Sequence, residues 1–173
     1  MAKIFICYRR SDSAGHAGRL YDRLVARFGR NRVYMDLDSI PFGSDFVEEI
    51  TKALNGCAAV LVLIGPQWFA GENRPRLTAA GDHVRQEIAQ ALKSKAKVFP
   101  VLFQGARMPA GTELPKDIQA LSRLHAIDLR DVSFDTDVQQ LFKALERLDG
   151  LKPAKPAGTG STRSKKTKSR TQT

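Results

Sequence analysis

Short apolar runs alternate with amphipathic stretches along most of the chain. The apolar runs, each as long as a typical β-strand, cover residues 3–8, 32–35, 58–64, 97–103 and 124–129. Between them, apolar residues recur at helical spacing over residues 18–28, 46–54, 82–93 and 134–148, and a short helical stretch ends near residue 121. Asp45 is expected to cap the second of these helices, with Glu48 as its capping-box partner. This alternation predicts a parallel sheet covered by helices.

The number and order of these elements fit one particular sheet topology. Five strands with four or five helices in about 150 residues suit a flavodoxin-like α/β fold, a doubly wound five-stranded parallel sheet with strand order 2-1-3-4-5. The uniformly apolar run 58–64 is then a central strand buried on both faces. In such a sheet, ligands bind beyond the carboxyl ends of the first and third strands, where the strand order reverses.

Polar residues follow the first strand at this expected crevice. Tyr8, Arg9 and Arg10 stand together at the strand end. Two adjacent guanidinium groups suit a ligand that carries phosphates, such as a nucleotide. A simpler interpretation of the arginines stays open, in which they lie at a solvated strand end and pair with Asp12 or Asp36.

Trp68 and Glu87 are further candidates near the same crevice. Trp68 follows the third strand, where its indole can stack on a ligand ring or simply anchor the loop on the sheet rim. Glu87 lies at the edge of the apolar stripe of helix 82–93, and His83, one turn earlier, points the same way. A half-buried carboxylate near a crevice is a candidate functional group. The alternative is an ordinary ion pair, with Arg85 or with a lysine from the C-terminal end of the chain.

Composition divides the chain into a folded part, residues 1–150, and a tail, residues 151–173. The formal net charge is +10, from 28 Lys and Arg against 18 Asp and Glu. Seven of the basic residues and none of the acids lie in the tail, and subtracting these seven leaves +3 for the folded part. The tail is too polar to bury a core and is interpreted as a disordered, solubilising extension. A contact with nucleic acid or an anionic membrane is the alternative.

The same composition argues against several classes of protein. The longest apolar run, 58–64, is too short to span a membrane, and no signal peptide follows Met1, so a cytoplasmic location is expected. Cys7 and Cys57 show neither disulfide nor metal-ligand spacing and, with three scattered histidines, predict no metal site. A chain without a G-x-G-x-x-G or P-loop motif is not expected to be a dehydrogenase or an NTPase.

Three segments carry a resemblance to one family. Residues 5–10, F-I-C-Y-R-R, resemble the opening F-I-S-Y-R-R motif of Toll/interleukin-1 receptor (TIR) domains. Residues 36–43, D-L-D-S-I-P-F-G, are similar to the BB loop of that family. Residues 82–88, D-H-V-R-Q-E-I, resemble the D-W-V-x-x-E-I segment around the catalytic glutamate of bacterial and animal TIR enzymes that cleave NAD. Because the three motifs occur in order within about residues 3–148, the chain is identified as a TIR domain that resembles bacterial-type NAD-cleaving enzymes.

The resemblance implies roles for the matching residues. Glu87 would be the catalytic glutamate, and NAD+ would be the substrate, with no further cofactor. Five residues would line the nucleotide site beside Tyr8 and Trp68 of the crevice: Arg9, Arg10, Asp36, Phe46 and His83. The apolar tip of the BB loop, through which TIR domains associate with themselves and with each other, would be Ile40, Pro41, Phe42 and Gly43. Two departures stand out: Cys7 replaces the usual serine, and His83 replaces the tryptophan of the animal enzyme.

The implied reaction suits a site with a single carboxylate. In NAD+ the nicotinamide is bonded to ribose as a pyridinium, so it leaves as a neutral molecule without a general acid. A carboxylate then stabilises the oxocarbenium-like transition state, and capture by water or by the adenine end gives ADP-ribose or a cyclic ADP-ribose. We expect such activity to be switched on by self-assembly, in signalling or defence. Two alternatives stay open: a non-catalytic module that signals by TIR–TIR association, and an enzyme similar to nucleoside deoxyribosyltransferases.

Overall fold

A parallel sheet organises the molecule, for which a computed structural model describes residues 1–35 and 43–154. Within these residues the strands are β1 (Lys3–Cys7), β2 (Val33–Met35), β3 (Cys57–Ile64), β4 (Lys97–Phe103) and β5 (Ile127–Leu129). Their order in the sheet is β2-β1-β3-β4-β5, and all neighbouring pairs are parallel. The predicted doubly wound topology is therefore confirmed.

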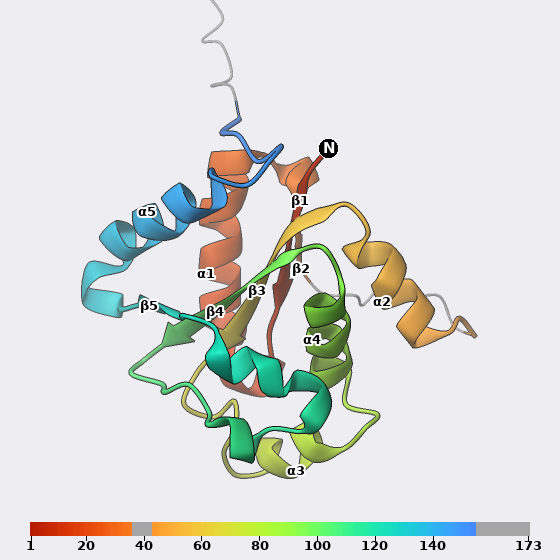
Figure 1. Ribbon diagram of the computed structural model, residues 1–173. Helices are drawn as coiled ribbons and strands as arrows, with labels where there is room; N and C mark the ends of the chain where they lie inside the picture. Colours follow the sequence, from red (N-terminus) through yellow and green to blue (C-terminus); the bar gives the residue numbers. More distant parts are fainter. Residues whose placement is uncertain (36–42, 155–173) are drawn as a thin grey trace, which may run out of the picture.

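Helices cover both faces of this sheet (Figure 1). The α-helices are α1 (Arg10–Phe28), α2 (Phe46–Leu54), α3 (Asn73–Thr78), α4 (His83–Lys93) and α5 (Phe134–Leu145). Short 3-10 helices are η1 (Arg30–Arg32), η2 (Gly111–Glu113), η3 (Lys116–Arg123) and η4 (Asp131–Ser133). Helices α1 and α5 pack on one face, whereas α2 and α4 pack on the other. In the described ranges, no helix has the length and apolar character needed to cross a membrane.

Strand β3 contributes to the hydrophobic core on both faces of the sheet. Residues 59, 61 and 63 pack with α1 and α5, and residues 60, 62 and 64 pack with α2 and α4. Because successive side chains of a strand point to opposite faces, a strand covered on both sides has no position for a polar residue. This confirms the expectation that the apolar run is a central strand.

Aspartate side chains begin two of the helices. Asp45 accepts the backbone N–H of Glu48 at 2.9 Å, as the sequence predicts for the N-terminus of α2. The Glu48 carboxylate pairs with Lys52, with 3.0 Å between Oε1 and Nζ. Asp82 accepts the backbone N–H of Arg85 at 3.0 Å and so caps α4. Both caps satisfy an N–H group that has no partner within its helix.

Helices α1 and α3 differ from the expectation. Helix α1 begins at Arg10 rather than at residue 18, with a kink at Ser13 (φ −136°, ψ 23°). Its first turns contain small and polar residues, so no apolar periodicity reveals them. Helix α3 lies within residues 65–81, where a loop was predicted. Its Pro75 stands in the first turn, where the missing N–H of proline is tolerated.

The packed domain continues beyond Gly150, where the sequence suggested that the tail begins. The Leu151 side chain is completely buried against the core formed by α1 and α5. The backbone N–H of Ala154 donates to the carbonyl of Arg27 at 2.8 Å, and Arg32 donates to the Gly150 carbonyl at 3.0 Å. The boundary expected after Gly150 therefore moves to at least residue 154, because an apolar side chain and backbone hydrogen bonds tie these residues to α1. The rest of the expected tail, residues 155–173, lies outside the described residues.

Candidate functional site

Four side chains with acid–base character meet at the carboxyl end of β1. Burial is the main cause that raises the pKa of the Cys7 thiol well above its usual value, followed by the charge of Glu87 and a hydrogen bond to the Glu87 carboxylate. The positive charge of Arg9 opposes this pKa shift, and Asp82 adds to it. Glu87 itself is half-buried on α4. The carboxylate of Glu87 therefore lies at the strand end that borders the expected crevice.

Arg9 and Asp82 form a buried ion pair inside this cluster. The Nη1 and Nη2 atoms of Arg9 donate to the two carboxylate oxygens of Asp82, at 3.0 Å and 2.8 Å. The side chains are only 2% and 5% exposed. The interpretation of Arg9 as part of a solvated strand end, paired with Asp12 or Asp36, is therefore wrong. A buried arginine is more stable when its guanidinium is paired with a carboxylate than when it is unpaired, because burial of an unpaired charge is costly.

Asp12 instead binds the loop that follows β3. Its carboxylate accepts the backbone N–H groups of Gly65 and Gln67, each at 2.8 Å. A second link runs beside it, because the Ser11 hydroxyl donates to the Asn73 side chain at 2.9 Å and the Asn73 amide donates to the Gln67 carbonyl at 2.8 Å. These contacts join the start of α1 to the end of β3, the two segments that border the crevice. The sequence contained no signal for them.

Phe46 and His83, both predicted to bind substrate, lie against each other. Their rings stack with centroids 3.9 Å apart and an interplanar angle of 23°. Phe46 is the first residue of α2 and His83 is the first residue of α4. The structure thus brings the start of α2, just after the BB loop, next to the helix that carries Glu87.

Trp68 is completely buried in the core between the sheet and the α2–α4 layer. Its indole Nε1 has no hydrogen-bond partner among the described residues. The cavity beside it has about 80 Å³, much less than the several hundred Å³ of a typical ligand pocket. Of its two interpretations, this packing favours the loop anchor over a residue that stacks on a ligand.

The other predicted site residues are placed as follows. Tyr8 is half-buried at the end of β1, and Arg10, the first residue of α1, is exposed. Gly43 is exposed and has φ +86°, a conformation that favours glycine. The predicted residues that lie outside the described residues are Asp36, Ile40, Pro41 and Phe42.

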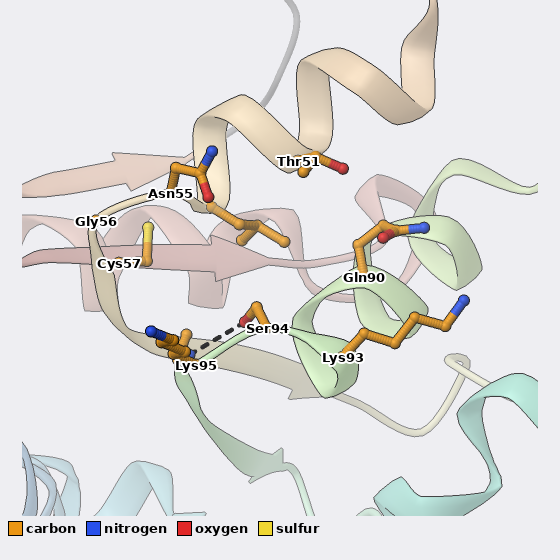
Figure 2. Close-up of a pocket in the computed structure, with 10 residues that line it drawn as sticks. Thr51, Asn55, Gly56, Cys57, Gln90, Lys93, Ser94 and Lys95 are labelled. Carbon is orange, nitrogen blue, oxygen red and sulfur yellow. Dashed lines mark hydrogen bonds between the residues drawn. The ribbon is translucent and has the colours of Figure 1, made fainter.

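A pocket of about 400 Å³ lies at the opposite end of the sheet, at the amino ends of β3 and β4 (Figure 2). Its polar lining comes from the last turns of α2 and α4 and from the turns that follow these helices, and includes Thr51, Asn55, Gln90, Lys93 and Lys95. Burial raises the pKa of the Cys57 thiol on its wall to about 11. Ligands of doubly wound sheets bind at the carboxyl ends of the strands, so this pocket is not the primary candidate.

Comparison with known proteins relates the chain to one family and to several solved structures that share its fold. A family model described as a TIR domain matches residues 4–142. The TIR domains of the activated Roq1 resistosome, which recognises the pathogen effector XopQ, share the fold with a TM-score of 0.57 and 15% identity, over 83% of this chain and 99% of that chain. The TIR domain of the Toll-related receptor TRR-2 from Hydra magnipapillata gives 0.56 and 16%, over 83% and 98%.

A prokaryotic SEFIR domain is similar to the same extent, with a TM-score of 0.55 and 17% identity over 82% of this chain and 90% of that chain. At such low identity these likenesses concern the fold alone. The search of curated proteins gives no match.

Proposed function

The chain belongs to the TIR domain family, and we propose that it cleaves NAD+ at the bond between nicotinamide and ribose, with Glu87 as the catalytic carboxylate. One observation carries this proposal. Glu87 is half-buried, and its charge and a hydrogen bond to its carboxylate help to raise the pKa of the Cys7 thiol. Cys7 is at the carboxyl end of β1, the edge where doubly wound sheets bind their ligands. A carboxylate at this place can lie beside the ribose of a nucleotide bound in the crevice.

The chemistry needs one well-placed negative charge. The bond between ribose and the pyridinium nitrogen breaks with its electron pair going to nicotinamide, which leaves as a neutral molecule. The ribose is left with positive charge shared between its anomeric carbon and ring oxygen. A half-buried carboxylate stabilises this charge more strongly than a solvated one, because little water screens it. Water then adds to the anomeric carbon and loses a proton, which yields ADP-ribose.

Two neighbouring groups suit the rest of the substrate. Arg10, the first residue of α1, is exposed, and its guanidinium can pair with the pyrophosphate. The stacked rings of Phe46 and His83 provide an aromatic surface for a flat base near the start of α4. We further propose that self-association through the BB loop completes this site, since that loop ends at Gly43, three residues before Phe46.

The test is to incubate the purified full-length protein at high concentration with NAD+ and to measure nicotinamide by chromatography. We expect release by the unmodified protein and a loss of about 100-fold or more for Glu87→Gln, the range seen when a group that stabilises the transition state is removed. Glu72→Gln, an exposed glutamate at the start of α3, is the control and should retain full activity.

Each other outcome points to a different function. No nicotinamide from the unmodified protein, even with a crowding agent that promotes assembly, would favour a non-catalytic TIR module. Equal release from the unmodified protein and Glu87→Gln would move the catalytic role to another residue. Base release from phosphate-free nucleosides, with NAD+ left intact, would favour the deoxyribosyltransferase-like alternative.

A further inference from the structure

We infer that Arg9 and Asp82 are positioning residues that lock the start of α4 onto the end of β1 and thereby hold Glu87 in place for reaction. In this role, neither residue contacts the substrate. The inference rests on the proposed function of Glu87, and it changes the role that the family resemblance implies for Arg9.

The ion pair has the geometry of a rigid lock. Two parallel N–H to oxygen contacts, at 3.0 Å and 2.8 Å, join the planar guanidinium of Arg9 to the planar carboxylate of Asp82. This bidentate arrangement fixes both distance and orientation, and it is strong because both partners are charged and shielded from water. The two residues are 73 positions apart in the chain, so the pair ties together elements that are remote in sequence.

Asp82 connects the lock directly to the helix. Its Oδ2 atom accepts a hydrogen bond from Arg9 Nη2 and also from the backbone N–H of Arg85 in the first turn of α4. One carboxylate therefore both caps the helix and attaches it to the strand end. A shift of Asp82 would move the helix start with it, because the cap ties the side chain to the helix backbone.

Glu87 provides a second point of attachment on the same helix. It lies in the next turn after the cap, and its carboxylate meets the Cys7 thiol, two residues before Arg9. With contacts at Asp82 and at Glu87, α4 is held at two points along one strand end. This restricts both tilt and rotation of the helix, and the reach of the Glu87 carboxylate into the crevice depends on both.

An ion pair on the outer side of α4 offers a matched control. Arg85 Nε donates to the Asp117 carboxylate at 3.0 Å and 3.1 Å, which links α4 to η3. This ion pair involves the same helix, but a single Nε–H is shared between both carboxylate oxygens, Asp117 is 36% exposed, and the pair links α4 to η3 instead of to β1. Removing it should leave the position of Glu87 unchanged.

The kinetic test uses two conservative variants, Asp82→Asn and Arg9→Lys. Asparagine caps helices as well as aspartate does, so Asp82→Asn removes the charge and keeps the cap. Lysine keeps the positive charge of Arg9 but lacks the planar fork. We expect both variants to lower kcat for NAD+ by about 10- to 100-fold, the effect of a small displacement of a reacting group, with KM changed by less than about threefold. The double variant should be no slower than the slower single variant, and Asp117→Asn should behave as the unmodified protein.

A different kinetic pattern would overturn the inference. If Arg9 binds the pyrophosphate directly, Arg9→Lys will raise KM with kcat preserved, and Asp82→Asn will not share this effect. Additive losses in the double variant would likewise show that the two residues act separately.

A second measurement does not depend on activity. Cys7 is buried beside the lock and Cys57 is buried at the other end of the sheet, so iodoacetamide labelling, followed by mass spectrometry of the two separate tryptic peptides, reports on each place. We expect Asp82→Asn and Arg9→Lys to speed the labelling of Cys7 by about 10-fold or more through local opening, with Cys57 unchanged. Asp117→Asn should alter neither rate.

The labelling result distinguishes the lock from the function on which it rests. An unchanged Cys7 rate, or equal acceleration at Cys7 and Cys57 through global unfolding, would overturn the lock. If the unmodified protein releases no nicotinamide, the proposed function fails, and the labelling still decides whether Arg9 and Asp82 hold α4 on β1.

Discussion

Asp12 and Gly65 meet so closely that no side chain fits between them. The Asp12 carboxylate accepts the Gly65 N–H at 2.8 Å, and a Cβ atom on Gly65 would lie 2.6 Å from Asp12 Oδ1. This contact fastens the start of α1 to the end of β3 across the crevice. Glycine is required here because a side chain has no space. Its backbone conformation is not the reason, since Gly65 does not have a positive φ and other residues can adopt the same conformation.

Gly65→Ala should therefore weaken the domain. The added methyl group must displace the Asp12 carboxylate, and we expect the free energy of unfolding to fall by about 1–3 kcal/mol. Urea denaturation followed by circular dichroism measures this change. Gly18→Ala is the control, because a Cβ at this position of α1 would meet nothing within 4 Å beyond its chain neighbours and the backbone of its own helix. It should stabilise the protein by about 0.5–1 kcal/mol. Equal stability of Gly65→Ala and the unmodified protein would show that Asp12 yields without loss.

The stacked pair of Phe46 and His83 predicts an effect on substrate binding. If these rings contact a base of NAD+, His83→Ala should raise KM by about 2- to 10-fold, the equivalent of one aromatic contact, with a smaller effect on kcat. His83→Trp should restore binding, because indole offers a larger flat surface. The exposed His125 is the control, and His125→Ala should have no effect on KM. A KM that is unchanged in His83→Ala would assign the pair a structural role only.

Residues 151–154, which pack on the domain, should contribute to its stability, and removal of the residues after them should not change it. Truncation after Gly150 removes Leu151 from the core, and loss of a buried leucine side chain costs about 2–5 kcal/mol. We expect the melting temperature to fall by roughly 5 °C or more, at about 2–4 °C per kcal/mol for a domain of this size. Truncation after Ala154 keeps these contacts and should leave the melting temperature within about 2 °C of the full chain. Similar melting temperatures for both truncations would contradict the packing role of Leu151.

The lowered pKa of the Asp137 carboxyl predicts how the stability of the domain depends on pH. The Arg130 side chain holds the pKa of this carboxyl well below its usual range, helped by the Arg130 backbone N–H at 3.0 Å and the Ser133 hydroxyl at 2.9 Å. A carboxyl with a lowered pKa in the folded state stabilises it fully above the unfolded pKa of about 3.9, and this contribution is lost as pH falls further. Asp137→Asn should therefore melt several degrees below the unmodified protein at pH 7.

The difference between Asp137→Asn and the unmodified protein should shrink when melting curves are recorded at steps below about pH 4. Asp135→Asn, which removes the more exposed partner of Arg23, is the control and should change the melting temperature little at any pH. A constant difference for Asp137→Asn from pH 7 down to pH 2 would show that the carboxylate charge is not its source.

The order of elements and the topology of the sheet could be predicted from the sequence, because both are written in local patterns. Strand β4 matches the predicted run 97–103, and helix α4 occupies the predicted segment, with Asp82 as its cap. Periodicity of apolar residues depends only on neighbours in the chain, and it reveals which face of each element is buried. The carboxyl end of β1 and the helix that carries Glu87 could be placed for the same reason, whereas the catalytic role of Glu87 was implied only by the family resemblance.

The partners of individual side chains were decided only by the tertiary structure. Arg9 was expected to bind the nucleotide or, as the alternative, to pair with Asp12 or Asp36. In the structure it binds Asp82, 73 residues away. Trp68 and Leu151 are buried although their local sequences resemble a loop and a tail. Contacts between residues far apart in sequence depend on the backbone conformation of the whole chain between them. A local pattern of apolar and polar residues contains no information about that conformation.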